Sequence, residues 1–166
     1  AYNFCYAAKE LLSVNLTGWD MSNITSAQNL FHSAGKDGIG CVFTLPNLDF
    51  SAATTMASIF QSAKISSIDL TDWTLRSTGV NFSSAFNSAK DNDASDAFNI
   101  DLSGWTNTVG INTMSNAFRA CDVTVLNLTG WNTSNVTTFG LGWYSASKIT
   151  KIIGLSGLSA ASNTGT

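Results

Sequence analysis

Apolar and polar residues alternate in five short triplets along this chain. The triplets, in which one polar residue separates two apolar ones, are VNL at 14–16, LDF at 48–50, IDL at 68–70, IDL at 100–102 and LNL at 126–128. Alternation with a period of two is typical of a short strand with one buried face. The chain is therefore predicted to contain several strands of about three residues each.

A second pattern follows the triplets and places aromatic side chains at regular intervals. Most of these aromatics have an apolar residue four positions earlier and a small residue three positions later. Positions spaced by three and four lie on one side of an α-helix, so each unit is predicted to carry a short helix with one buried stripe. The anchoring aromatics, about 25 to 32 residues apart, are Phe4, Phe31, Phe60, Phe86, Phe118 and Trp143.

A tryptophan follows the last residue of four triplets by three positions. This shared register predicts a buried tryptophan stack rather than exposed sugar-binding rings. The elements together predict an α/β fold, a leucine-rich-repeat-like solenoid of about five to six short strand-turn-helix units stacked in one curved or straight array. The predicted structural core is Trp19, Trp73, Trp105, Trp131, Phe4, Phe31, Phe60, Phe86, Phe118 and Trp143.

One repeat domain is predicted to occupy residues 1–166, as a segment of a longer protein or of an assembly subunit, because neither end resembles a polar cap. The second unit is short and has Ala53 where tryptophan is expected, and extra residues at 35–40 and 90–96 predict two loops. The units are expected at approximately 1–13 (partial), 14–46, 47–67, 68–98, 99–125, 126–151 and 152–166 (partial).

The phrase Leu-Thr-Gly-Trp-Asp/Asn-x-Ser-Asn-Ile/Val-Thr occurs at 16–25 and again at 128–137, and the typical unit continues into a Met/Phe-x-x-x-Phe segment. This pattern resembles the BspA-like leucine-rich-repeat surface proteins, and the resemblance covers nearly the whole chain. It implies a repeat domain of bacterial or protist surface proteins, often adhesins, with relatives in bacteriophage virion proteins. It implies no catalytic residues.

The composition excludes several kinds of partner. Only 11% of residues are charged and the net charge is -3, so the chain has no basic footprint for nucleic acid. Its apolar runs are too short to insert into a membrane. The cysteines have no CxxC spacing, which favours neither a disulfide framework nor a zinc site. Cys121 is predicted to be a core thiol, and a bridge between Cys5 and Cys41 is left open.

The residues that could serve in catalysis or metal binding are each explained better by a structural role. His32 is the only histidine, and without a GxSxG motif it is predicted to be a solvent-facing helix residue. The aspartates recur with the repeat instead of forming one pair suited to glycoside hydrolysis. The acidic segment 91–96 lacks EF-hand spacing and is read as a solvated loop. No enzyme activity, metal or cofactor is expected.

The polar centres of the triplets, with the Ser or Thr two positions later, are predicted to form an outward ladder on the sheet. Such a ladder can bind a ligand by hydrogen bonding, because solenoids use extended surfaces for recognition. It can equally solvate an open sheet face and order the turns. The predicted binding residues are Asn15, Thr17, Asp49, Ser51, Asp69, Thr71, Asp101, Ser103, Asn127 and Thr129.

The sequence therefore favours a non-catalytic recognition or adhesion module that binds a host-cell protein or glycan. Its expected location is extracellular, on a bacterial envelope or on the surface of a phage virion. The alternative is a structural virion or envelope module that packs against neighbouring subunits without a soluble ligand. A third reading, ordered water on Ser/Thr ladders as in ice-binding solenoids, is disfavoured by the uneven repeat lengths.

Overall fold

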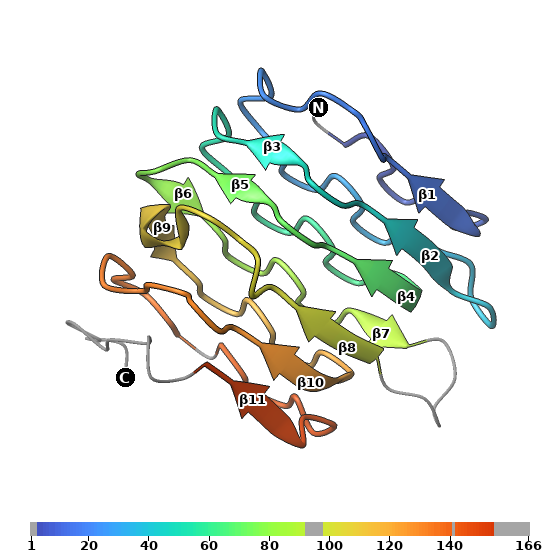
Figure 1. The fold of residues 1–166 in the computed structure, drawn as a ribbon. Coiled ribbons are helices and arrows are strands. Elements are labelled where there is room, and N and C mark those ends of the chain that lie inside the picture. The colour runs from blue at the N-terminus through green and yellow to red at the C-terminus, as the bar shows by residue number, and fades with distance from the viewer. Residues whose placement is uncertain (1–2, 92–97, 141, 155–166) are drawn as a thin grey trace.

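The chain folds into a β-solenoid of about five turns, each of which we call a coil (Figure 1). This computed structural model describes residues 3–91, 98–140 and 142–154. One strand per coil lies beside its equivalent in the next coil, so that the strands form a row along the solenoid. This row contains β1 (Ser13–Asn15), β2 (Cys41–Thr44), β4 (Lys64–Asp69), β8 (Phe98–Asp101), β10 (Val123–Asn127) and β11 (Lys151–Ile153).

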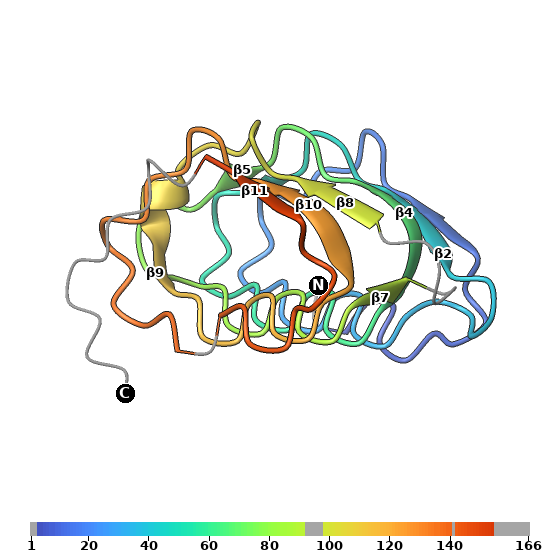
Figure 2. The same cartoon turned by 90° about the horizontal axis from the view of Figure 1, so that it is seen from below.

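All pairings between these strands are parallel, as expected when a chain passes the same face once per coil. Strands β1, β2, β4 and β7 (Lys90–Asp91) form one sheet, and β8, β10 and β11 form a second. Two smaller parallel pairs line other sides of the coil: β3 (Asp49–Phe50) with β5 (Thr74–Leu75), and β6 (Val80–Asn81) with β9 (Ile111–Thr113). Figure 2 shows the coils as an oblong ring, whose interior holds the hydrophobic core.

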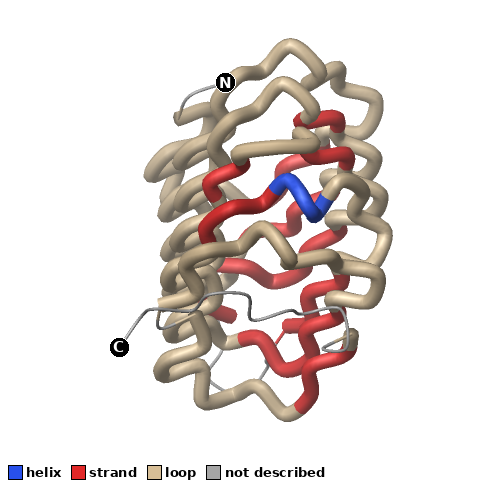
Figure 3. The backbone as a smooth tube through the Cα atoms, turned by 90° about the vertical axis from the view of Figure 1, so that its left-hand side faces the viewer, coloured by secondary structure: helices blue, strands red, loops and turns tan. Residues whose placement is uncertain are grey.

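The predicted α/β leucine-rich-repeat fold is wrong, because no α-helix occurs in the described part of the chain (Figure 3). One short 3-10 segment, Thr108–Gly110, is the only helical element there. The segments expected to be helices are successions of tight turns in which residues four apart have positive φ, such as Asn29 at 56° and Ser33 at 54°. Asn and Ser are short polar residues, and Asn in particular tolerates this left-handed conformation.

The backbone hydrogen bonds of these turns explain how they replace helices. The N–H groups of Asn29, Phe31 and Ser33 donate to carbonyls of the next coil at 3.0, 2.8 and 2.8 Å, while the intervening N–H groups close turns within the coil. An α-helix would keep all of these bonds within itself. We call this side of the solenoid the turn face; its stacked segments are residues 3–8, 27–34, 56–63, 82–89, 114–121 and 142–146.

The distance between coils excludes helices at this position. The rings of Phe31 and Phe60, in successive coils, are 5.1 Å apart, close to the ~4.8 Å separation of neighbouring strands. Packed α-helices need about 8–10 Å between their axes. The tight turns nevertheless bury the positions that a helix would bury, since Ala27, Phe31 and Ala34 are fully buried.

Two aromatic stacks run through the core along the solenoid. The rings from Phe31 to Trp143 are stacked at 5.1, 5.1, 5.5 and 5.1 Å in successive coils, and three tryptophans are stacked at 4.7 and 5.6 Å. Each of these tryptophans donates its indole N–H to a leucine carbonyl of the preceding coil, as Trp131 does to Leu102 at 2.8 Å. The stacks consist of Phe31, Phe60, Phe86, Phe118 and Trp143, and of Trp73, Trp105 and Trp131.

In the first coil, the anchoring core position is one residue later than predicted. Cys5, not Phe4, donates to Leu30 of the next coil in the way that Phe31 donates to Ile59. Phe4 is therefore 47% exposed and packs edge-on against Trp19, which is 51% exposed. Both aromatics were expected in the core; they are half-exposed because the described part of the chain places no coil beyond them.

We expect Trp131→Ala to lower the free energy of unfolding by about 3–5 kcal/mol, because it removes a fully buried ring and its indole hydrogen bond. The matched change Trp19→Ala removes a half-exposed ring and should cost far less. Urea unfolding followed by circular dichroism compares the two variants. Equal losses would contradict the half-exposed position of Trp19 in the first coil.

Candidate binding surfaces

The structure brings most of the predicted ladder residues onto the outward side of the main strand row. Asn15 aligns with Thr44 and then with Asp69 across β1, β2 and β4, and Asp101 aligns with Asn127 across β8 and β10. The residues that follow these positions by two are all exposed at the ends of the strands: Thr17, Thr71, Ser103 and Thr129. We call this surface the sheet face.

Asp49 and Ser51 do not belong to the sheet face. Asp49 lies in β3, which pairs with β5 on another side of the coil. Thr44 takes the place in the row that Asp49 was expected to take, because β2 lies before the LDF triplet. The short second unit misled the alignment, since its triplet has the same pattern as the true strand positions.

The Asn and Asp side chains of the sheet face have a structural task. Asn15, Asp69, Asp101 and Asn127 each accept a hydrogen bond through Oδ1 from the backbone N–H two residues later, at 2.9–3.1 Å. Asp49 does the same at 2.8 Å although it lies elsewhere. Such Asx turns let Asn and Asp end a strand and direct the chain into a turn. This accounts for the Asn/Asp-x-Ser/Thr spacing in every unit, and it fixes the orientation of each of these side chains.

The carboxylate of Asp101 is held in its ionised form by its neighbours. Partial burial opposes ionisation, but hydrogen bonds from the hydroxyl and amide of Ser103 and from the side chain of Asn127 outweigh it. The pKa of Asp101 therefore lies below its ordinary value of 3.8. A polar link between neighbouring coils is thus part of the sheet face.

The turn face carries a second row of polar residues, which the sequence analysis did not identify. One residue per coil follows the anchoring core position, and most of these side chains are planar. Tyr6 stacks on His32 at 5.0 Å between ring centres, and the Arg119 guanidinium lies 5.7 Å from the centre of the Tyr144 ring. The position is immediately C-terminal to the anchor, so it is visible in the sequence once the first coil is aligned on Cys5. The row consists of Tyr6, His32, Gln61, Asn87, Arg119 and Tyr144.

His32 lies on this turn face and not on a helix. It is partly buried, its Nδ1 is hydrogen-bonded to the Ser33 hydroxyl at 3.0 Å, and its ring stacks against Tyr6. Burial lowers the pKa of His32 below 6.5, although a backbone hydrogen bond partly opposes this effect. The imidazole is consequently neutral near neutral pH.

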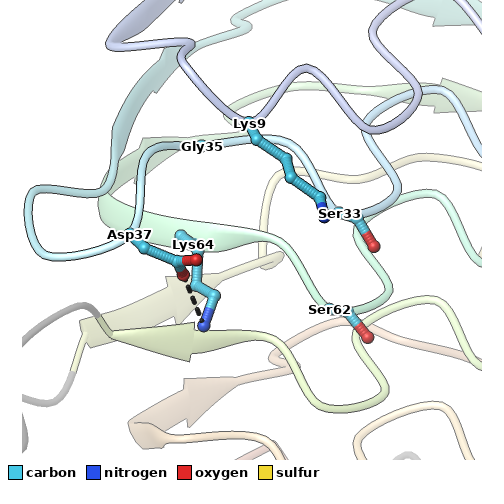
Figure 4. A pocket seen from close by; sticks show the side chains of 6 residues that line it. All are labelled: Lys9, Ser33, Gly35, Asp37, Ser62 and Lys64. Carbon is cyan, nitrogen blue, oxygen red and sulfur yellow. Dashed lines mark ion pairs between the residues drawn. The ribbon is translucent and has the colours of Figure 1, made fainter.

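A pocket of about 210 Å³ lies at one edge of the turn face (Figure 4). Three successive coils line it, through Lys9, Gly35 and Lys64 and through the hydroxyl side chains of the second and third coils. Lys64 forms an ion pair with Asp37 at 3.1 Å. Figure 4 shows Lys9 reaching across from the first coil toward Ser33. The complete lining is Lys9, Ser33, Gly35, Asp37, Ser62 and Lys64.

The cysteines are free thiols. Cys121 is fully buried, which confirms its prediction as a core thiol, and burial raises its pKa to about 12. Burial, with a smaller effect from the neighbouring Cys5 thiol, raises the pKa of Cys41 to about 11. These two thiols therefore stay protonated, and weakly nucleophilic, near neutral pH.

Within residues 3–91, 98–140 and 142–154, no cluster of three His, Cys, Asp or Glu side chains is arranged to hold a metal ion. The same residues contain no helix that is long and apolar enough to cross a membrane. The acidic segment read as a solvated loop lies mostly at 92–97, outside the described residues.

A family model described as "Mycoplasma protein of unknown function, DUF285" matches the chain twice, over residues 2–95 and over residues 39–156. The matches overlap and together cover most of the sequence, as expected when a repetitive chain fits one model in two alignments. No curated protein matches the chain, and no solved structure matches it.

We expect Asp101→Ala to lower the free energy of unfolding by about 1 kcal/mol, because it removes the acceptor of the Asx turn. Asp101→Asn retains an Oδ1 acceptor, as Asn127 does, and should cost less.

Since the pKa of Asp101 is lowered by folding, its ionised form contributes stability above pH 3.8 that is lost as pH falls through the folded-state pKa. Urea unfolding of wild type and Asp101→Asn between pH 2 and 7 measures this. An unchanged pH dependence in Asp101→Asn would contradict the assignment.

Proposed function

We propose that this chain, which belongs to the DUF285 family, is a non-catalytic recognition module displayed on a bacterial or virion surface, where it binds a host-cell protein or glycan. The likeness of its Gly-Trp-Asp/Asn repeats to BspA-like surface proteins supports a surface location. A solenoid suits this role because its stability comes from contacts between neighbouring coils and leaves long outer faces for ligands.

The observation that carries the proposal is the row of outward polar side chains on the sheet face. Asp101 and Asn127 stand opposite each other at one coil spacing, and Asp69 continues the arrangement in a preceding coil. Each has its Oδ1 held by an Asx turn, so the orientation of the side chain is fixed before a ligand binds. Preorganised acceptors and hydroxyls at a repeating distance favour a ligand that itself presents repeated polar groups.

The low charge of the surface favours recognition by neutral hydrogen bonding. Only 11% of residues are charged, and the three ion pairs of the described residues use Lys36, Lys64 and Lys148. Hydroxyl-rich glycans and polar protein surfaces suit such a face better than polyanions do, since binding to polyanions relies on concentrated positive charge.

A structural module that packs against neighbouring subunits is the second candidate, and the exposed apolar residues of the first coil favour it. Phe4, Tyr6, Leu12 and Trp19 are each about half-exposed there. Clustered apolar exposure of this kind marks interaction sites on soluble proteins. A neighbouring subunit that covered this end would bury the same rings that an additional coil would bury.

We expect the purified chain to bind a component of a glycan array or the surface of intact host cells. The double change Ser67→Arg and Ser103→Arg should weaken this binding at least about tenfold, because two long charged side chains would obstruct the sheet face. Both residues are exposed. The backbone N–H at position 103, which donates to Asp101 Oδ1, is kept in the variant. Fluorescence binding to the array and flow cytometry on cells provide the measurements.

Thr78→Arg is the matched control, because Thr78 is also exposed but lies between β5 and β6, away from the sheet face. It should bind as wild type does. If the double variant, folded by circular dichroism, binds as tightly as wild type, the sheet face is not the recognition surface. The structural candidate would be established instead if the chain binds no ligand and assembles through its first coil. Trp19→Arg should then abolish that assembly.

A further inference from the structure

We propose that the pocket at the edge of the turn face binds the carboxylate of an acidic sugar, with Lys9 as its ionic partner and the stacked Tyr6 and His32 rings as a platform for the sugar. This inference rests on the proposed function for the idea that the ligand is a glycan. The glycan would bind at the turn face and not at the sheet face, and it would carry a negative charge.

The shape of the pocket follows from a missing side chain in the second coil. Lys9, Gly35 and Lys64 occupy equivalent positions, because Gly35 donates to the residue before Lys9 and Lys64 donates to the residue before Gly35. A Cβ on Gly35 would lie 2.3 Å from the Lys64 carbonyl oxygen, and φ at Gly35 is +104°. The close approach of the coils therefore requires glycine here, and the glycine leaves a hollow between two lysines (Figure 4).

The charges around the hollow leave one positive charge uncompensated. Asp37 neutralises Lys64 at 3.1 Å, and Glu10 neutralises Lys36 at 2.7 Å. Lys9 forms no ion pair within the described residues, and it is exposed. A ligand group with a single negative charge therefore matches the single free ammonium of Lys9. A doubly charged phosphate would need a second free ammonium, and the Asp37 carboxylate would repel it.

Two serine hydroxyls complete the polar wall of the pocket. Ser33 and Ser62 have positive φ values of 54° and 56°, and alanine occupies the equivalent position in other coils, at Ala7 (53°) and Ala120 (51°). The fold therefore does not require a hydroxyl at this position. Ser33 is hydrogen-bonded to His32, and the Ser62 hydroxyl makes no hydrogen bond within the described part of the chain, so it can donate to a carboxylate oxygen.

The aromatic pair lies next to this wall. Tyr6 is three residues before Lys9, and His32 directly precedes Ser33. The two rings are stacked at 5.0 Å with an angle of 21° between their planes, and Tyr6 is 50% exposed. An exposed aromatic face offers apolar contact to a sugar ring, while the Lys9 ammonium and the serine hydroxyls of the pocket offer the polar contacts. Sialic acids and uronic acids both combine a ring with one carboxylate.

We expect 3′-sialyllactose or a hyaluronan hexasaccharide, which contains glucuronate, to bind the chain, and lactose not to bind. Isothermal titration calorimetry at low salt measures the affinities, which should fall as salt is added because the Lys9 contact is exposed. Binding of the sialylated probe alone would assign the pocket to sialic acids, and binding of hyaluronan alone would assign it to uronates. If neither probe binds, the proposal is overturned.

Lys9→Gln should weaken the binding of the acidic probe at least about tenfold, since it removes the one lysine of the pocket lining that forms no ion pair within the described residues. Ser62→Ala, a change that Ala120 shows to be compatible with the backbone, should weaken it several-fold. Lys151→Gln removes an exposed lysine from β11 and should leave the affinity unchanged. Equal affinity of Lys9→Gln and wild type, with both folded, would overturn the proposal.

The sheet-face variant Ser67→Arg and Ser103→Arg separates this inference from the proposed function. If it binds the acidic probe normally, the pocket stands whether or not the sheet face recognises a ligand of its own. If it loses the acidic probe while Lys9→Gln retains it, the acidic sugar binds to the sheet face and the pocket does not.

Discussion

The hydrogen bonds between successive coils set the dimension on which the rest of this molecule depends. Parallel strands lie ~4.8 Å apart, and the rings of the Phe31 stack follow at 5.1–5.5 Å. Every coil must therefore place equivalent atoms at this distance on all of its sides. The turn face meets the requirement by donating alternate N–H groups to the next coil, and the core meets it by stacking flat rings. Stacked α-helices, which need about 8–10 Å between their axes, are therefore excluded.

The same dimension connects the core to the outer surfaces. Trp131 fills the interior and at the same time satisfies the Leu102 carbonyl of the preceding coil, so the identity of the core residue also determines a link between coils. On the outside, Asp101 ends its strand through an Asx turn and accepts a hydrogen bond from the side chain of Asn127. Residues that shape the chain locally are therefore the residues that form rows on the surface. Insertions such as the segment around Asp37 leave the coil at its edges and do not disturb these rows.

The sequence predicted the periodic features of the fold, because a repeated register is visible without knowledge of the backbone. The stack of Trp73, Trp105 and Trp131 and the buried thiol of Cys121 are examples. The prediction of helices was wrong because apolar residues spaced by three and four lie on one buried side both in an α-helix and in these tight turns. The distinguishing signal was Asn or Ser two residues before and after the anchor, as at Asn29 and Ser33. Both residue types favour turns over helix interiors, and Asn also tolerates positive φ. The sheet-face row was predicted except at Asp49, where a repeated triplet in a short unit concealed the true strand. The pocket could not be predicted, since it depends on a glycine that faces a neighbouring coil.

The half-exposed rings of the first coil also determine how the molecule responds to force. Phe4 and Trp19 contact each other and are half-exposed, whereas an interior ring such as that of Phe86 is stacked between the rings of two neighbouring coils, Phe60 and Phe118. Tension on the first coil loads its bonds to the second coil before the bonds farther along, so the coils would separate one at a time, each releasing a length set by the size of that unit. The molecule would then lengthen in steps under tension, and the coils that are still stacked would keep their outer faces intact while the strain is absorbed.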